Sequence, residues 1–263
     1  TKSQGVIVND CIYGYMLYGM DKVIFENKLV LSVDYAVPAH DEVIDGDLEI
    51  KGGSVLSYSH KLRIQGNVFL KNNAELRSGN ELIVEGDVTG FGQIVTCERE
   101  SEEGYRYTDG KMLIKGKVEL NSGRVYSSVR EGCHIQKDLV LNGDSYLMLY
   151  DGNMTVDGSI RLNSTNASEF DDGSITLKGD FIQKKKPFQS EKDDWGLRLV
   201  MTGDNTQNIY LEDSEDERFK MIDMRSAFKV NVTGKLRAGK MLGMDAAYPA
   251  EGEKLVIELD QYR

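Results

Sequence analysis

The chain is poor in the residues that mark disulfide-bonded, metal-binding and many catalytic proteins. Its 263 residues include three cysteines, three histidines, three prolines and one tryptophan. Cys11, Cys97 and Cys133 are odd in number and far apart, so they predict neither a disulfide framework nor a structural zinc site. No nucleophile-elbow, zinc-protease or nucleotide-binding motif occurs in a supporting context. We therefore predict no catalytic residue, no metal and no cofactor.

An excess of basic charge is also missing. Lys and Arg number 32 against 43 Asp and Glu, which gives a net charge of −11. Binding to nucleic acid or to an anionic membrane surface needs a basic patch, so we expect neither partner. No run of apolar residues is long enough to span a bilayer, so we expect no membrane insertion. Because the chain begins at Thr1 without a secretion signal, we expect it to be a segment of a longer protein.

What the sequence does contain is a repeated five-residue phrase: an apolar residue, any residue, Gly, any residue and a second apolar residue. The stretches from Ile64 to Val68 and from Val84 to Val88 are two copies. The central residues of the nine copies are 46, 66, 86, 116, 137, 158, 179, 203 and 234, with Lys in place of Gly at 137. Most neighbouring copies lie 20 or 21 residues apart, and such a period predicts a repeat protein.

Around each phrase, every second residue is apolar or Gly, as from Leu62 to Leu70. Alternation with a period of two predicts a strand that buries one face. A second short apolar run follows in some coils, for example Leu147-x-Leu149, and turn-forming Asn, Ser, Gly and Asp separate the runs. No stretch predicts a helix of any length.

Because the phrase returns in the same phase, we predict an all-β, single-stranded, right-handed parallel β-helix, or β-solenoid, of about ten coils stacked about 4.8 Å apart. Two apolar columns should fill its core. One is Leu62, Leu82, Met112, Cys133, Met154, Ile175, Leu199 and Val230, and the other is Ile64, Val84, Ile114, Ile135, Val156, Leu177, Met201 and Val232. Gly should mark a bend because it accepts φ values that other residues resist, and the Asp or Asn after it should cap backbone groups. Cys133 should be a small apolar filler.

The repeat also divides the chain. We predict an N-terminal cap over residues 1–40, which contains a strand at 23–33, then the solenoid over 41–243 and a C-terminal strand or cap over 244–263. The ends of a solenoid are strand edges that need covering. Insertions near 97–110, 184–195 and 212–218 should interrupt the coils, since the spacing of the phrase lengthens there.

These interruptions are where a solenoid is expected to carry specificity. Tyr105 and Tyr107 in the first insertion are suited to stacking on a sugar or gripping a peptide. In the second insertion, Lys184 and Lys185 precede Trp195, a combination suited to an anionic glycan. We therefore expect a glycan or protein ligand to bind through the loops. The alternative, in which the aromatic residues pack the loops against their own coils, stays open.

One stretch resembles a known repeat. It reads Gly-x-x-Thr-Gln-x-Ile from Gly203 to Ile209, continues with Phe219 to Asp223, and ends with the phrase from Val230 to Leu236. This order is similar to the repeats of large bacterial surface solenoids of the adhesin or haemagglutinin type. The resemblance implies a non-enzymatic structural or binding segment of a larger secreted or cell-surface protein, whose coils extend and display.

Two other functions stay open. A β-helix polysaccharide lyase or glycoside hydrolase would need carboxylates and cations in one groove, where Asp171 and Asp172 would have to meet Lys184–Lys186 and Trp195. A self-assembling filament of the bactofilin type has coils of similar period and would associate end to end or laterally. Such a filament would place the chain in the cytoplasm.

Overall fold

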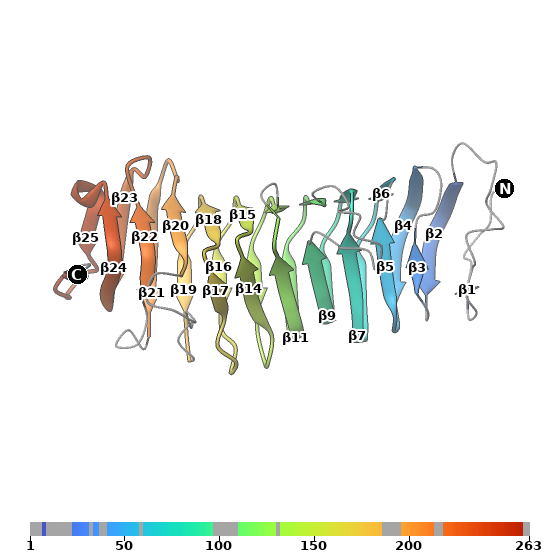
Figure 1. Cartoon of the computed structure of the whole chain (residues 1–263), viewed down its shortest axis with the longest axis horizontal. Helices are drawn as coiled ribbons and strands as arrows, with labels where there is room; N and C mark the ends of the chain where they lie inside the picture. The colour runs from blue at the N-terminus through green and yellow to red at the C-terminus, as the bar shows by residue number, and fades with distance from the viewer. Residues whose placement is uncertain are drawn as a thin grey trace.

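The computed structural model of the protein describes residues 7–8, 23–31, 34–36, 41–57, 60–96, 110–129, 132–185, 196–212 and 218–259. The strands of these residues form one parallel sheet that winds into a β-solenoid of about nine turns. Figure 1 shows the coils side by side along the long axis, from the N-terminal to the C-terminal end. The predicted all-β solenoid is therefore confirmed, with about nine turns in place of about ten.

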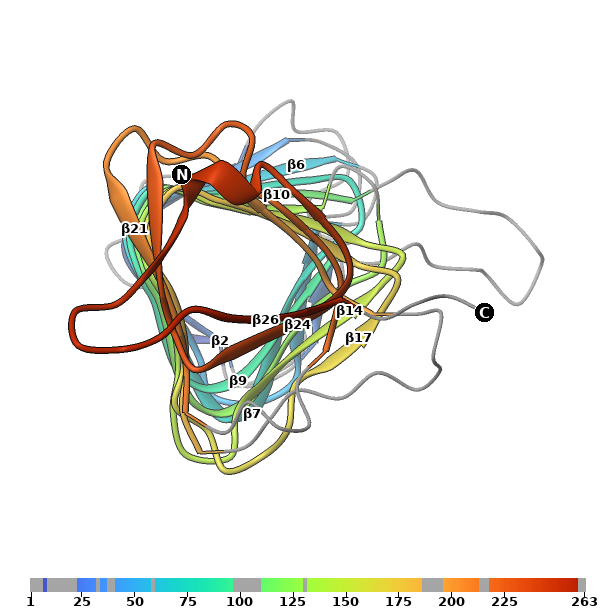
Figure 2. The same cartoon turned by 90° about the vertical axis from the view of Figure 1, so that its left-hand side faces the viewer.

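Each regular coil contributes a strand segment to each of three faces, which enclose a roughly triangular section (Figure 2). The first face stacks β6 (Lys61–Ile64), β8 (Glu81–Val84), β10 (Lys111–Ile114), β12 (Cys133–Ile135), β15 (Asn153–Val156), β18 (Ser174–Leu177), β20 (Arg198–Met201) and β22 (Phe219–Asp223). The second face stacks β13 (Leu139–Leu141), β16 (Ile160–Leu162), β19 (Phe181–Gln183), β21 (Thr206–Leu211), β23 (Lys229–Thr233) and β25 (Ala247–Pro249). The third face includes β3 (Tyr35–Ala36), β5 (Ser54–Ser57), β14 (Tyr146–Tyr150), β17 (Glu169–Asp171) and β26 (Val256–Leu259).

Longer strands turn a corner and serve two faces. They are β2 (Val23–Leu31), β4 (Glu42–Ile50), β7 (Val68–Ser78), β9 (Val88–Thr96), β11 (Val118–Ser127) and β24 (Lys235–Leu242). At the N-terminal end, β2 pairs with β4 along its whole length, and β1 (Ile7–Val8) pairs with β2. A short 3-10 helix at Met244–Ala246 turns the last corner.

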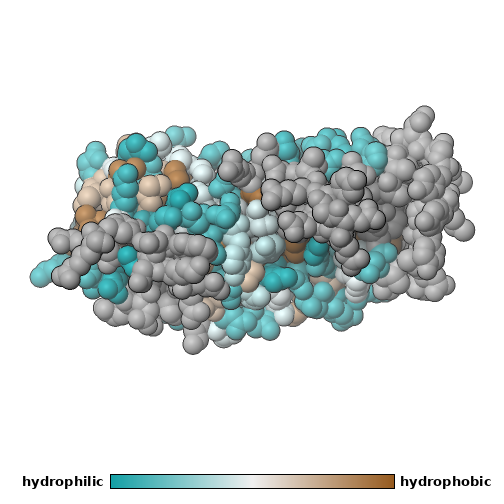
Figure 3. Space-filling view, viewed as in Figure 1, coloured by the Kyte–Doolittle hydropathy of each residue, from teal (hydrophilic) through white to brown (hydrophobic). Residues whose placement is uncertain are grey.

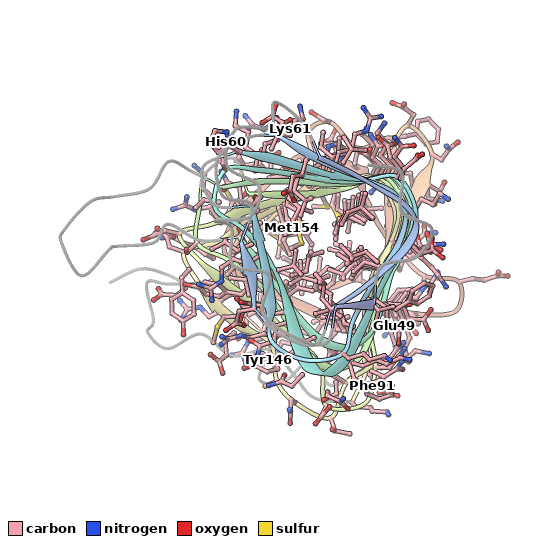
Figure 4. All side chains as sticks on the ribbon, turned by 90° about the vertical axis from the view of Figure 1, so that its right-hand side faces the viewer. Glu49, His60, Lys61, Phe91, Tyr146 and Met154 are labelled. Carbon is pink, nitrogen blue, oxygen red and sulfur yellow. The ribbon has the colours of Figure 1, made fainter. Side chains whose placement is uncertain are left out.

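The apolar columns fill the interior. Cys133 pairs with Met112 below it and Met154 above it, and Figure 4 shows Met154 pointing into the coil. All three side chains are buried in the same continuous core. The predicted columns are thus correct from the coil of β6 to the coil of β20.

The structure corrects the last member of each column. Val230 and Val232 lie on the second face, where β23 pairs with β21. The residue above Leu199 is Ile222, because β22 follows β20 on the first face. The gap of 31 residues before Gly234 therefore contains a further coil whose corner lacks the glycine phrase, and Gly234, at a φ of 92°, turns the chain away from the second face.

The corner glycines do mark a bend, between the first and second faces, but the predicted reason is wrong. Of the corner glycines from 46 to 179, none has a left-handed φ. Space is what they lack: a Cβ on Gly86 would lie 2.6 Å from the Gly66 carbonyl oxygen and 2.5 Å from Asn67 Oδ1. At these glycines successive coils approach so closely that a Cβ would collide with the coil before it.

At most corners the residue after the corner position builds a polar ladder, which Lys117, after Gly116, interrupts. Asp47 Oδ1 accepts the Asn67 N–H at 2.7 Å, and Asn67 Oδ1 accepts the Asp87 N–H at 2.9 Å. Asp138 Oδ1 does the same for the Ser159 N–H at 2.7 Å. Each side chain therefore satisfies a backbone donor of the next coil, which confirms the predicted capping role.

Burial also sets the chemistry of Cys133. The residue is 1% exposed, which confirms it as an apolar filler, and burial raises the pKa of its thiol to about 12. The reactive thiolate is therefore scarce at neutral pH.

We predict that Cys133 does not react with an aromatic disulfide reagent until the protein unfolds. The measurement needs a Cys11→Ser/Cys97→Ser variant, so that only one thiol is counted. In this variant the released chromophore should appear with the rate of unfolding in urea. Prompt reaction of the native protein would contradict the core position of Cys133.

Candidate functional site: an aromatic strip on the third face

The third face carries aromatic side chains across β11 and β14. Along β14, buried Leu147 and Leu149 alternate with half-buried Tyr146 and Tyr150, and β11 adds half-buried Tyr126. Figure 4 shows Tyr146 pointing outward from the coil. The outward-facing side chains here are Tyr126, Tyr146, Met148 and Tyr150, which we call the tyrosine strip.

Contacts within the strip hold its rings in place. The rings of Tyr126 and Tyr150 lie 6.1 Å apart between centroids, tilted at 51°. The Arg124 guanidinium lies 5.6 Å from the centroid of the Tyr126 ring, and its Nε donates to Gln93 Oε1 at 2.8 Å. Since a neighbouring cation and ring restrain Tyr126, little conformational freedom is left to lose when a ligand binds.

Charged groups border the strip where the third face meets the first. The Tyr150 hydroxyl donates to Glu169 Oε2 at 3.4 Å. Beyond β17, Arg198 Nη2 donates to both carboxylate oxygens of Asp172, at 2.9 and 3.1 Å, and Lys220 also bonds to Asp172. Two cations thus share one carboxylate at this corner.

The tyrosine strip lies between predicted insertions. Tyr126 pairs with Val95 of β9, and β9 ends at Thr96, where the first insertion begins. The second and third insertions begin after β19 and β21, which are neighbours on the second face. A ligand that reached the starting points of these loops would lie beside the strip.

The structure describes two of the five predicted site residues. Those outside the described residues are Tyr105, Tyr107 and Trp195. Lys184 Nζ lies 6.0 Å from the centroid of the Tyr210 ring, and the Lys185 N–H donates to Glu212 Oε2 at 2.6 Å. The starts of the second and third insertions are thus in direct contact.

The groups that the enzyme hypothesis needs are not brought together within the described residues. Asp172 lies between the third and first faces, where it bonds to Arg198 and Lys220. Lys184 lies at another corner, directly after β19 of the second face. Lys186 and Trp195 fall outside the described residues. No three His, Cys, Asp or Glu side chains in the described ranges could hold a metal ion.

Sequence reasoning missed the tyrosine strip because it looked for breaks in the repeat. The strip obeys the period of two and occupies its outward positions. The available signal was chemical: Tyr146 and Tyr150 are aromatic and flank the inward residues of the predicted run Leu147-x-Leu149, and Tyr126 lies beside buried Val125 of β11. Aromatic side chains are costly to leave in water, so three of them on one outer face point to a contact surface.

The first face carries a separate charged cluster. His134 alternates with buried Cys133 and Ile135 and so points outward. Its Nε2 lies 2.9 Å from Asp157 Oδ2, while Lys178 Nζ lies 2.7 Å from Asp157 Oδ1. Burial acts to raise the pKa of Asp157, but the hydrogen bonds from Lys178 and His134 outweigh it and lower this pKa. The cluster links three successive coils.

We predict that Asp157 contributes stability that acid removes. Its pKa is lower in the folded than in the unfolded chain, so the contribution is complete above the ordinary carboxyl pKa and disappears as the pH falls through the folded one. The Asp157→Asn variant should be less stable than the parent by about 0.5 kcal/mol at neutral pH, and the difference should vanish near pH 2. Urea unfolding at both pH values measures this, with exposed Asp144→Asn as the control. An Asp157→Asn deficit that persists in acid would contradict the ionic origin.

Comparison of the chain with protein-family models, curated proteins and solved structures gives no match in any of the three.

Among the residues that the structure describes, no helix combines the length and apolar character needed to cross a membrane.

Proposed function

We propose that the chain is a non-enzymatic display segment of a larger bacterial secreted or surface protein, and that it contacts a glycan ligand through its third face. The tyrosine strip is the observation that carries this proposal. It places three aromatic rings outward on one face, beside the cations of Arg124, Arg198 and Lys220. Flat rings stack on sugars, and the cations would suit acidic ones.

The rest of the molecule is suited to act as a stiff scaffold. Its core is one continuous apolar column system, and its corners are joined coil to coil by side-chain hydrogen bonds. Such a rod holds loops and faces at fixed positions along its length. The placement at the bacterial surface depends on the sequence resemblance to adhesin-type repeats, including the Thr-Gln pair at 206–207.

A glycan array probed with the fluorescently labelled chain tests the proposal. The parent chain should bind a restricted set of glycans, and a Tyr126→Ala/Tyr150→Ala variant should bind the same set at least tenfold more weakly. Tyr248→Ala, which removes an exposed tyrosine from the second face, should bind normally. Equal binding by the strip variant, or no binding by the parent, would contradict the proposal. Release of new sugar ends would favour the polysaccharide-cleaving alternative instead.

A further inference from the structure

Exposed apolar side chains gather at one end of the described solenoid. The large hydrophobic residues that are exposed are Phe91, Phe228, Met244, Tyr248, Val256 and Leu259. All except Phe91 belong to the last two coils, and Figure 3 shows hydrophobic residues at this end of the molecule. Single exposed apolar residues are common, but a group of five at one end indicates a contact surface.

Figure 2 views the molecule from this end. No described strand covers the core here. Leu259 pairs with Ala238, which is completely buried, yet Leu259 itself is 48% exposed. Ile257 pairs with buried Leu236 and is only partly buried. These side chains continue the inward-facing column of the third face, and no described strand lies over them. A solenoid end of this kind needs a cover.

The two strands at this end differ in what they can pair with. β25 pairs with β23 and β26 pairs with β24, and neither has a second partner among the described strands. β25 contains Pro249, which has no backbone N–H and so weakens any further pairing there. β26 contains no proline, and its edge can accept another strand. An added strand should therefore pair with β26.

We propose that the strand that covers β26 is β26 of a second copy of the chain, in antiparallel pairing about a two-fold axis at Ile257. The inward residues Leu255, Ile257 and Leu259 are all apolar and are symmetric about Ile257. In this register, Ile257 lies opposite its own equivalent and Leu255 lies opposite Leu259 of the second copy. The inward apolar side chains of each β26 then cover those of the other.

The charge of β26 selects this register. A shift that centred the pair on Glu258 would set two carboxylates directly opposite each other, which is unfavourable. In the proposed register Glu258 lies opposite Val256 of the second copy. Within its own chain Glu258 is already held by Lys235 Nζ at 2.6 Å and by Arg237 Nε at 3.1 Å. The two Glu258 side chains are then diagonal to each other and not directly opposite, and each is neutralised by cations of its own chain.

The contact is small, because it consists of one short strand and the end of the core, so the dimer should form in a concentration-dependent way. A two-fold contact uses the same surface on both copies and closes the assembly at two. The proposal thus differs from an open filament. It is also independent of ligand binding by the tyrosine strip, which lies several coils away.

Sedimentation velocity of the whole chain over about a hundredfold concentration range tests the association. The parent should shift from monomer to dimer, and Leu259→Asp should remain monomeric at the highest concentration. Phe91→Asp, which changes the exposed apolar residue far from this end, should dimerise like the parent. Circular dichroism confirms that each variant is folded. A parent that stays monomeric, or a Leu259→Asp variant that still dimerises, would overturn the proposal.

Cysteine crosslinking tests the register in the Cys11→Ser/Cys97→Ser background. Mixing a Val256→Cys variant with a Glu258→Cys variant should give a disulfide-linked heterodimer under mild oxidation, because these positions are opposite each other in the proposed pair. Either variant alone should crosslink at least tenfold less. Efficient crosslinking of Glu258→Cys alone, or the growth of open-ended filaments, would show a different contact and overturn the two-fold pairing.

Discussion

Replacing Gln207 with leucine should cost the protein about 3–5 kcal/mol of unfolding free energy, although leucine nearly preserves the volume of the side chain. Gln207 is 1% exposed. Its Oε1 accepts the Gly203 N–H at 2.9 Å, and its Nε2 donates to the carbonyl oxygens of Leu177 at 3.1 Å and Gly179 at 2.7 Å. Leucine would leave the Gly203 N–H and the Gly179 carbonyl buried without a partner, whereas the Leu177 carbonyl still accepts the Thr202 N–H at 2.9 Å. Each backbone group left in this way costs about 1–3 kcal/mol.

The position of Gln207 explains why the effect should be large. In regular corners the glycine N–H bonds directly to the glycine carbonyl of the coil before it, as Gly86 does to Gly66 at 3.1 Å. The corner from Met201 to Gln207 is longer, and the amide of Gln207 stands between the Gly203 N–H and the Gly179 carbonyl. One side chain therefore replaces the hydrogen bond that joins consecutive coils.

Urea unfolding followed by circular dichroism measures the change. The control is Thr206→Ala, which alters the exposed neighbour of Gln207 and should change the stability by less than about 0.5 kcal/mol. A Gln207→Leu variant as stable as the parent would show that the buried amide does not join the coils. The same bonds give a physical reason for glutamine at position 207.

Much of the fold could be predicted from the sequence because a solenoid translates period directly into geometry. The inward columns up to Leu199 follow from alternation, and the capping role of Asp47, Asn67 and Asp138 follows from their short hydrogen-bonding side chains. The prediction failed between Met201 and Gly234, because there the corner is built by Gln207 and by residues 223–229 instead of by the glycine phrase. The phrase at Gly234 looks the same in sequence but occupies a different corner.

The candidate site was harder to predict than the fold. A pattern of alternation identifies which residues face outward, but it does not show which outward residues of different coils lie side by side. Tyr126 and Tyr150 are 24 positions apart, and stacking of β14 on β11 brings their rings to 6.1 Å. Likewise, Asp172 and Lys220 bond across 48 positions, because β18, β20 and β22 lie in order on the first face. Insertions are visible in the sequence because they lengthen the repeat period, whereas the tyrosine strip leaves the period unchanged.

The close approach of successive coils at the corner should also make the unfolding free energy sensitive to a substitution at Gly86. Gly86→Ala should destabilise the chain by about 2–3 kcal/mol, the cost of forcing a methyl group into a packed backbone. The Cβ would lie 2.6 Å from the Gly66 carbonyl oxygen and 2.5 Å from Asn67 Oδ1. Neither atom can move freely, since the first accepts the Gly86 N–H and the second accepts the Asp87 N–H.

The sequence first indicates that glycine is needed at this corner for its φ. In that case the stability of Gly86→Ala should depend on the backbone conformation and not on the space around the Cβ. Gly86 has no left-handed φ, so alanine would then be tolerated and even slightly stabilising. The matched control is Lys137, which occupies the same column in another coil and already carries a side chain. Lys137→Ala should change the unfolding free energy by less than about 0.5 kcal/mol. A loss for Gly86→Ala with no loss for Lys137→Ala would show that the close approach of the coil before it, and not the corner position as such, requires glycine at Gly86.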